Sequence, residues 1–150
     1  MDHMRTKRLT SDDVVLARQV FMLMAEVFAE GGEPLDDAYL ARLLRREDFW
    51  AIAAFAGDEV IGGITAHALP MTRSAATELF IYDLAVRADH QRKGVGRRLV
   101  TVLREEAASH GIHDVFVPAD NEDTHALDFY RALGGAPAPV TIFTFTAAEE

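Results

Sequence analysis

The stretch from Glu78 to Gly111 constrains the fold more than any other part of the sequence. It opens with ELFIYDLAV, a run of aromatic and branched residues that favours a β-strand. Polar residues and two glycines, Gly94 and Gly96, follow. Apolar residues then recur at helical spacing: Val95, Leu99, Val102, Leu103 and Ala107. Gly111 ends the pattern where glycine commonly follows a helix, so the stretch predicts a strand, a glycine loop and an amphipathic helix.

The N-terminal part of the chain predicts one strand and two helices. We expect the strand over residues 5–9, followed by an amphipathic helix that ends at Gly31-Gly32. The candidate N-cap residues of this helix are Thr10, Ser11 and Asp12. A second helix follows Pro34 and extends to about residue 45.

The remaining segments complete a mixed α/β sheet in a single domain over residues 1–150. Two strand-like runs, 49–56 and 59–69, flank Gly57-Asp58, a dipeptide that suits a two-residue hairpin turn. A short strand over 114–117, a helix over 124–133 and a final strand over 140–146 follow. No internal repeat or linker interrupts this order.

The charge balance bears on the kind of partner. The chain has 15 Lys and Arg residues against 24 Asp and Glu residues, a formal net charge of -9. Nucleic acid is excluded as the main partner because phosphate neutralisation needs a broad basic surface. A cationic substrate is compatible with this charge, although net acidity can also serve solubility alone.

Composition also indicates the compartment. Cysteine is absent, so disulfides and thiolate metal sites are excluded and a reducing, cytoplasmic location is expected. The apolar runs are too short to span a bilayer, and the first residues lack an apolar signal core. We expect no metal, because His110 and His113 flank a helix-ending glycine with no carboxylate placed to complete a site.

The loop between the central strand and its helix predicts an anion site. A helix N-terminus exposes backbone N–H groups, and glycines let a phosphate approach them closely. Five basic residues lie in the segment from Arg87 to Arg98, inside an otherwise acidic chain. The spacing therefore predicts a pyrophosphate cradle, whereas a plain glycine turn with solvated arginines is the simpler alternative. The cradle residues are Gln91, Arg92, Lys93, Gly94, Val95 and Gly96.

Gln91 to Gly96 match the pattern Q/R-x-x-G-x-G/A and so resemble the acyl-CoA motif of the GNAT superfamily of N-acetyltransferases. Within that superfamily, IYDLAV before the motif and the acidic segment with Tyr130 after it look like the type I aminoglycoside 3-N-acetyltransferases. The resemblance implies a six- to seven-stranded mixed sheet, with splayed fourth and fifth strands and about four flanking helices. Pro118 suits a sheet that is open at the fifth strand, and equally suits a simple strand end.

The resemblance also implies where acetyl-CoA would bind as cosubstrate. The backbone groups of Leu84, Ala85 and Val86 would pair with the pantetheine arm as if it were an added strand. N–H groups from Arg92 to Arg97 would hold the pyrophosphate.

Two residues are candidates for the chemistry of acetyl transfer. The resemblance places Tyr130 near the thioester sulfur, although a core aromatic is the alternative for this residue. A tyrosine pKa near 10 against about 8.5 for a thiol makes full proton donation uphill by about 2 kcal/mol. A hydrogen bond to the thiolate, or a lowered Tyr130 pKa, is therefore favoured over free transfer. Asp83 is the first candidate for the base, because a carboxylate in an apolar strand is costly unless it is used or paired.

Other acidic residues would attract the substrate, and these carboxylates are also the alternatives to Asp83 as the base. His125 is a weaker candidate base. For Asp123, helix capping is the favoured role. The candidate substrate-binding carboxylates are Glu78, Asp120, Glu122 and Asp123.

These features predict an N-acetyltransferase that acts on a small cationic amine by direct attack in a ternary complex, with the 3-amino group of an aminoglycoside as first choice. A polyamine or a protein N-terminal amine is the alternative substrate, and a non-catalytic acyl-CoA-binding regulatory module is the alternative class. The apolar C-terminal strand fits either a homodimer interface or the domain's own sheet.

Overall fold

The computed structural model describes residues 4–147, and the chain divides into two compact units, Met1–Pro118 and Ala119–Glu150. We describe each unit by itself. The elements of the first unit are β1 (Met4–Arg8), α1 (Val14–Val27), α2 (Asp37–Arg45), β2 (Phe49–Ala56), β3 (Glu59–Pro70), β4 (Thr77–Val86), a 3-10 turn (Ala88–His90), α3 (Val95–Ser109) and β5 (Asp114–Phe116). The second unit holds α4 (Thr124–Ala132).

The first unit is built on a five-stranded mixed sheet in the order β1-β2-β3-β4-β5, which confirms the predicted fold class. The first four strands are antiparallel neighbours, whereas β4 and β5 are parallel. The predicted hairpin is present, since β2 and β3 are joined by Gly57-Asp58 with a positive φ of 60° at Gly57. This conformation needs glycine or a similarly permissive residue.

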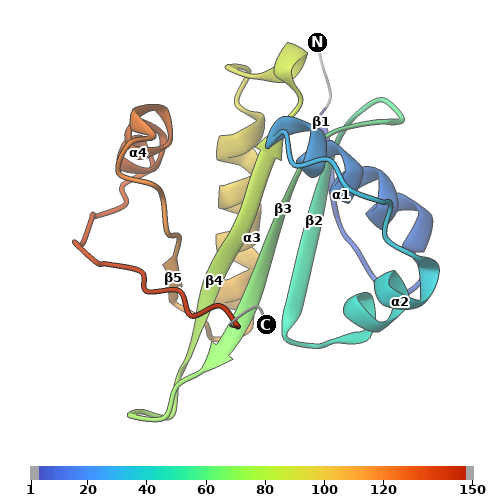
Figure 1. Ribbon diagram of the computed structural model, residues 1–150. Helices are drawn as coiled ribbons and strands as arrows, with labels where there is room; N and C mark the ends of the chain where they lie inside the picture. The colour runs from blue at the N-terminus through green and yellow to red at the C-terminus, as the bar shows by residue number, and fades with distance from the viewer. Residues whose placement is uncertain (1–3, 148–150) are drawn as a thin grey trace. The chain divides into compact units, whose positions relative to one another are not determined.

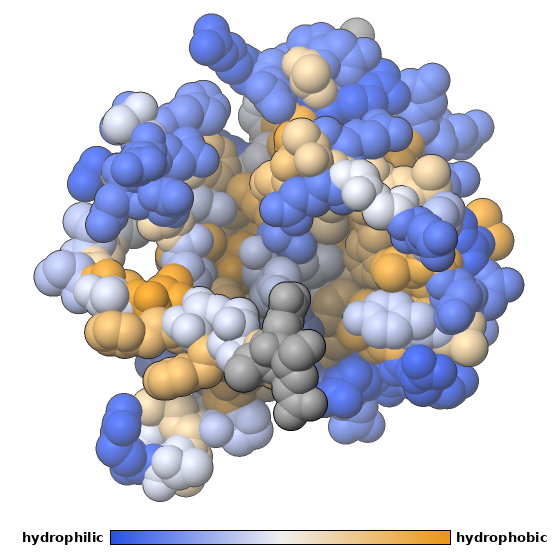
Figure 2. Space-filling model, in the orientation of Figure 1, coloured by the Kyte–Doolittle hydropathy of each residue, from blue (hydrophilic) through white to orange (hydrophobic). Residues whose placement is uncertain are grey.

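The predicted count of six to seven strands is wrong for the described residues, because the segment 140–146 forms no strand. Its large side chains are exposed, from 72% at Val140 to 96% at Phe145. Alternating β-branched and aromatic residues suit a pleated surface, but a strand forms only when a neighbour completes its hydrogen bonds. In the space-filling view this segment shows orange, hydrophobic side chains at its surface (Figure 2).

Helices cover both faces of the sheet in the first unit (Figure 1). Successive side chains of β2 point to opposite faces of the sheet and so contact different helices. Phe49, Ala51 and Phe55 lie in one buried cluster with residues of α1 and α2. Trp50 points to the other face, where its ring lies 5.2 Å from that of His110 at the end of α3.

Gly63 of β3 allows α1 to lie close against the sheet. A Cβ placed on Gly63 would lie 2.5 Å from Cγ1 of Val20 and 3.3 Å from Cε of Met24. Both contacts come from the buried side of α1. The helix can therefore pack at this depth only because residue 63 has no side chain.

We expect Gly63→Ala to lower the free energy of unfolding by about 1–3 kcal/mol, because the methyl group overpacks the α1 interface. Urea unfolding measures the loss. Gly32→Ala is the matched control, because a Cβ there meets nothing within 4 Å. The control should stay within about 0.5 kcal/mol of the wild type. Equal stability of the two variants would contradict the close approach of α1.

Candidate active site

The edge of β4 that faces β5 is paired over only part of its length. Parallel pairing joins Glu78–Phe80 to Asp114–Phe116 and then stops. The rest of β4 continues to Val86 while paired on its other side with β3. This gives the open fourth and fifth strands that the sequence predicted, in a form that leaves part of one strand edge without a strand partner.

Hydrogen-bond alternation shows which residues of β4 offer their backbone to this open edge. The N–H of Arg87 donates to the carbonyl of Ile61 at 2.8 Å, so this pair is bonded toward β3. In an antiparallel ladder every second pair is bonded in this way. Ala85 therefore turns its N–H and C=O toward Gly63, whereas Leu84 and Val86 direct theirs outward. Of the three residues expected to bind pantetheine, these two have backbone groups aimed at the open edge.

The loop after β4 has the backbone shape of an anion cradle. Arg92 and Gly94 both have positive φ, 64° and 85°, and Gly94 is the N-cap of α3. Such a left-handed residue next to a helix start turns consecutive N–H groups toward one point. Gln91 donates its side-chain N–H to the carbonyl of Val86 at 3.1 Å and so fixes the loop to the end of β4.

The basic residues of the loop have two different roles. Arg87 bonds Asp89 at 2.7 Å and Glu59 at 3.2 Å, and these carboxylates raise the pKa of its guanidinium. The exposed side chains of Arg92, Lys93 and Arg97 form no ion pair with other described residues. Arg87 therefore braces the turn, while the other three leave positive charge around the start of α3, as a pyrophosphate requires.

A β-bulge in β4 aims Asp83 at the side of the sheet that α1 covers. Thr65 pairs with Asp83 and Ala66 with Ile81, so Tyr82 is the extra residue of the bulge. Thr65 also pairs with Ala51, which belongs to the buried cluster under α1 and α2. Directly opposed residues share a face, so the Asp83 carboxylate points toward α1. Bulges re-aim side chains in this way.

Asp83 is half-buried and has an unusual electrostatic environment. Burial raises the pKa of its carboxyl, and the nearby negative charge of Glu30 raises it further. No hydrogen bond or cation among the described residues offsets these effects. Since a carboxylate with a raised pKa is a stronger base, its environment suits proton removal from a bound amine.

The end of α1 explains why Glu30 lies near Asp83. The sequence placed the end of this helix at Gly31-Gly32, but α1 ends at Val27. Ala29 has a left-handed φ of 55°, and the N–H of Glu30 bonds the carbonyl of Ala25 at 2.9 Å. This is the Schellman geometry in which glycine usually occupies the left-handed position. The early turn brings Glu30 over the sheet.

A hollow of about 490 Å³ lies between the last turns of α1 and the segment 29–35. Its wall includes the apolar side chains of Phe21 and Met22. Its carboxylates are Glu26, Glu30 and Glu33. Sequence reasoning missed these acids, although their position beside a Gly-Gly pair between two helices was a usable signal.

Glu78 lies away from Asp83, although both belong to β4. Five residues separate them, which corresponds to roughly 16 Å along a strand. Glu78 pairs with Leu69 and with Asp114, at the end of β4 far from the cradle. The structure thus places Glu78 apart from the base candidate.

The second unit contains the remaining residues that the sequence predicted for the site. Asp120 accepts a hydrogen bond from the N–H of Glu122 at 2.9 Å, and Asp123 caps α4 by accepting from the N–H of Ala126 at 3.0 Å. Capping is therefore the structural role of Asp123, the alternative that the sequence had favoured. Burial raises the pKa of Tyr130, with a smaller contribution from Asp123. The shift is opposite to the lowered pKa considered above, so Tyr130 stays a neutral hydroxyl.

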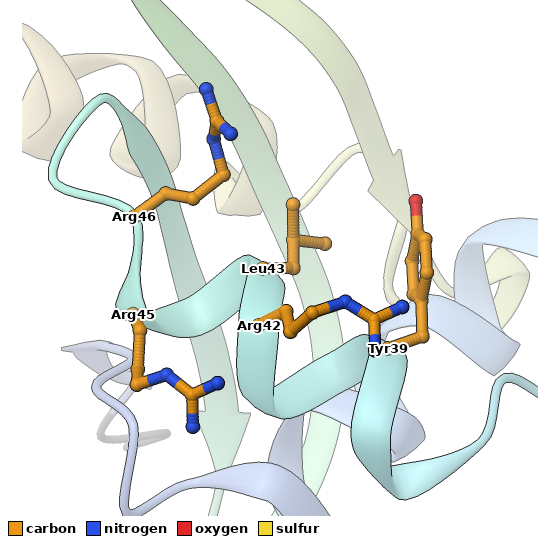
Figure 3. A pocket seen from close by; sticks show the side chains of 5 residues that line it. All are labelled: Tyr39, Arg42, Leu43, Arg45 and Arg46. Atoms are coloured by element: carbon orange, nitrogen blue, oxygen red, sulfur yellow. The ribbon is translucent and has the colours of Figure 1, made fainter.

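Another hollow found among the described residues lies on a different element from this site. A second hollow, of about 570 Å³, is lined by side chains of α2 and the residue after it, with three arginines among them (Figure 3). Its lining residues are Tyr39, Arg42, Leu43, Arg45 and Arg46. Within residues 4–147 no cluster of three potential metal ligands is found. In the same range no helix is both long and apolar enough to cross a membrane.

Comparison with known proteins identifies the family. Residues 17–134, most of the chain, match the acetyltransferase (GNAT) family. The chain therefore belongs to this family of acetyltransferases, whose acyl donor is acetyl-CoA. The positive-φ loop at the start of α3 and the outward backbone of Leu84 and Val86 fit that donor.

Solved structures of aminoglycoside acetyltransferases resemble the whole chain. The protein meta-AAC0020 from an uncultured soil metagenomic sample is 32% identical, with a TM-score of 0.92 and 97% of each chain covered. It was solved in complex with trehalose and, separately, with sisomicin. HMB0005, also from soil metagenomic DNA, is 31% identical with the same TM-score, over 97% of this chain and 99% of its own.

Curated relatives match over shorter stretches. The uncharacterised N-acetyltransferase YvbK of Bacillus subtilis is 33% identical over 81 residues, which are 54% of this chain and 49% of the relative. N-acetyltransferase family 8 member 2 of Rattus norvegicus is 27% identical over 86 residues, 57% of this chain and 37% of the relative. The matched part thus spans at most about half the length of these relatives.

We expect Gly94→Ala to weaken CoA binding at least about tenfold, because a left-handed alanine costs about 1–2 kcal/mol and relaxes the loop away from the cradle shape. Gly111→Ala is the matched control, since Gly111 has a φ of 75° at the other end of α3 and a Cβ at either position meets nothing within 4 Å. Calorimetric titration with CoA and thermal unfolding measure both effects. The two variants should lose similar stability, and equal loss of CoA affinity in both would contradict the cradle.

Proposed function

We propose that this protein transfers the acetyl group of acetyl-CoA to an amine of an aminoglycoside, with the 3-amino group as the acceptor. The observation that carries the proposal is the position of Asp83: a half-buried carboxylate aimed at the α1 face, next to the strand edge that would hold the acyl donor. The similarity of the full chain to two aminoglycoside acetyltransferases at 31–32% identity supports this substrate class.

The reaction proceeds by direct attack in a ternary complex. The ammonium group loses one proton to the Asp83 carboxylate, and the lone pair of the resulting amine attacks the thioester carbonyl carbon, so a C–N bond forms as the C–S bond breaks. The electron pair of the C–S bond leaves with the thiolate of CoA. The nitrogen is positively charged after the attack, and it gives its second proton to the thiolate, so that the products are a neutral amide and the CoA thiol. In this proposal Tyr130 would donate a hydrogen bond to the thiolate, and its raised pKa would keep the phenol protonated meanwhile.

The acidic surroundings fit a polycation. Glu30 and Glu33 line the hollow at the end of α1, and the charge of Glu30 acts on Asp83. The net charge of -9 also favours the approach of cations. Carboxylates that attract an ammonium group also raise its pKa and hold it in the unreactive form. A base with a raised pKa offsets this effect, which is the role proposed for Asp83.

We expect Asp83→Asn to lower kcat/KM by about 10²–10⁴-fold, because it removes the general base. In the wild type the acidic limb of the pH profile should lie above the ordinary aspartate pKa of about 3.9, since burial and Glu30 raise the pKa of Asp83. The variant should lose this limb. Asp58→Asn, at the exposed hairpin turn, is the control and should keep the wild-type profile.

The same raised pKa predicts an effect on stability. The folded protein binds the proton of Asp83 more tightly than the unfolded chain, so the charged carboxylate destabilises the fold above the raised pKa. We expect Asp83→Asn to raise the Tm at pH 7 and to have a smaller effect as the pH falls below the ordinary aspartate pKa of about 3.9, where the carboxyl is protonated in both the folded and the unfolded chain. A lower Tm at pH 7 would contradict the environment described for Asp83.

The two units would work as one acetyltransferase domain, since the family match runs across both. Tyr130→Phe tests this joint action and separates catalysis from a regulatory acyl-CoA-binding role. We expect kcat with sisomicin to fall roughly 10- to 100-fold, the value of a hydrogen bond to a charged group, while CoA affinity is unchanged. A protein that binds CoA but releases none with sisomicin, a polyamine or a basic peptide would be the regulatory module instead.

The choice of substrate has its own test. Thiol release from acetyl-CoA should be rapid with sisomicin and slow with spermidine or a basic peptide, and fragmentation of the product should place the acetyl group on the 3-amino position. Faster turnover of the polyamine or peptide would keep the chemistry and replace the substrate. We propose a cytoplasmic location for the reaction, with homodimer formation through the apolar C-terminal segment to be checked by light scattering.

A further inference from the structure

A row of aromatic side chains crosses four strands at one register. On β3 the row passes through His67, two residues from Thr65, the partner of Asp83. Phe49 of β2 pairs with His67 of β3, His67 pairs with Phe80 of β4, and Phe80 pairs with Phe116 of β5. Opposed residues share a face, and Phe49 belongs to the buried cluster under α1 and α2. The row therefore lies on the same side of the sheet as the Asp83 carboxylate.

The rings are in contact along the row. The centroids of Phe49 and His67 are 5.3 Å apart, and those of Phe80 and Phe116 are 5.1 Å apart with an interplanar angle of only 10°. Tyr82, the extra residue of the bulge, joins them: its ring lies 5.6 Å from His67 and 5.7 Å from Phe80. The aromatic row, as we call Phe49, His67, Phe80, Tyr82 and Phe116, is thus continuous.

One end of the aromatic row belongs to the core and the other is open. Phe49 is 7% exposed and packs edge-on against Phe21 of α1, with centroids 6.3 Å apart. Tyr82 is 61% exposed and Phe116 40% exposed. Cross-strand packing explains the buried end, because aromatic pairs stabilise sheets. Cross-strand packing does not explain why Tyr82, the extra residue of the bulge, is largely exposed to solvent.

The neighbours of the open end point to a cationic occupant with apolar faces. Tyr82 directly precedes Asp83, and Glu30 lies close enough to Asp83 to raise the pKa of its carboxyl. Aromatic faces attract ammonium groups and pack well against flat apolar surfaces. A purely apolar partner would leave the carboxylates buried without a counter-charge, which is costly. An amino sugar offers both the C–H face of a ring and ammonium groups at its rim.

We propose that the open end of the aromatic row, Tyr82 with Phe80 and Phe116, is a platform on which a ring of the amino-sugar substrate lies, so that its amine is presented to Asp83. This inference rests on the proposed function and adds the residues that would select ring-shaped polycations over linear ones. Tyr82 acts here as a positioning residue, through its ring face.

The test compares ring-bearing and linear polycations by direct binding. Sisomicin and spermidine are titrated calorimetrically into the CoA-loaded protein, so that the readout does not depend on turnover. The variants are Tyr82→Leu, which keeps apolar bulk and removes the ring, and Tyr82→Phe, which keeps the ring and removes the hydroxyl. Tyr39→Leu on α2 is the matched control, because Tyr39 is also an exposed tyrosine, at 46%.

We expect Tyr82→Leu to weaken sisomicin binding about tenfold or more while spermidine binding changes less than about threefold. Tyr82→Phe and Tyr39→Leu should bind both ligands as the wild type does, and the Tm of all three variants should stay close to that of the wild type. The proposal is overturned if Tyr82→Leu binds sisomicin normally, if it loses both ligands equally, or if Tyr82→Phe is as weak as Tyr82→Leu. Wild-type protein that binds sisomicin through Tyr82 without acetylating it would instead refute the proposed function alone.

Discussion

The partial pairing of β4 is the constraint on which the rest of the candidate site depends. Full pairing with β5 would satisfy the outward backbone groups of Leu84 and Val86 and leave no strand edge for the pantetheine arm. Because pairing with β5 stops at Phe80, these groups have no β5 partner, although the Val86 carbonyl accepts a bond from Gln91. The chain passes directly from them into the loop that begins α3. Gln91 joins the two parts through its bond to the Val86 carbonyl. The strand edge and the loop that begins α3 are therefore continuous, and under the proposed function they would form one binding path for an extended donor.

The bulge at Tyr82 resolves a conflict within the same strand. A regular strand would point Tyr82 and Asp83 to opposite faces, and only one of them could face α1. With the extra residue, the Tyr82 ring contacts His67 and Phe80 while Asp83 stays opposite Thr65. A carboxylate and an aromatic ring thereby become neighbours on one surface. This arrangement favours a ligand that is at once cationic and ring-shaped.

The sequence predicted the parts of the fold that local chemistry decides. Gly57-Asp58 defines the hairpin turn, and Gly94 and Gly111 bound α3 because both adopt positive φ there. Local chemistry did not predict the bulge, the position of Glu30 or the lack of a strand over residues 140–146. Ala29 takes the left-handed position although glycines follow two residues later, so the glycines do not mark where α1 ends.

The candidate site was predictable to the extent that it lies in one motif. The spacing of the residues from Gln91 to Gly96 predicts the cradle. Asp83 is predicted as a candidate base because it is a lone carboxylate in an apolar strand. Glu30 escaped notice because its role depends on a tertiary approach between α1 and β4. The aromatic row escaped for the same reason, since Phe49 and Phe116 are far apart in sequence and meet the row only through strand register.

Burial decreases along the aromatic row, so its buried end contributes to stability and its exposed end is free to affect ligand specificity. Phe49 is held by Phe21 and the core, so its replacement would disturb the packing of α1. Tyr82 contributes less buried area, because the residue is 61% exposed. Substitutions at the open end can therefore change which ligand fits while the sheet and the cradle remain intact. Under the proposed function, donor binding would use backbone groups and acceptor binding would use exposed side chains. A scaffold of this kind could therefore keep one acyl donor and exchange its amine acceptors.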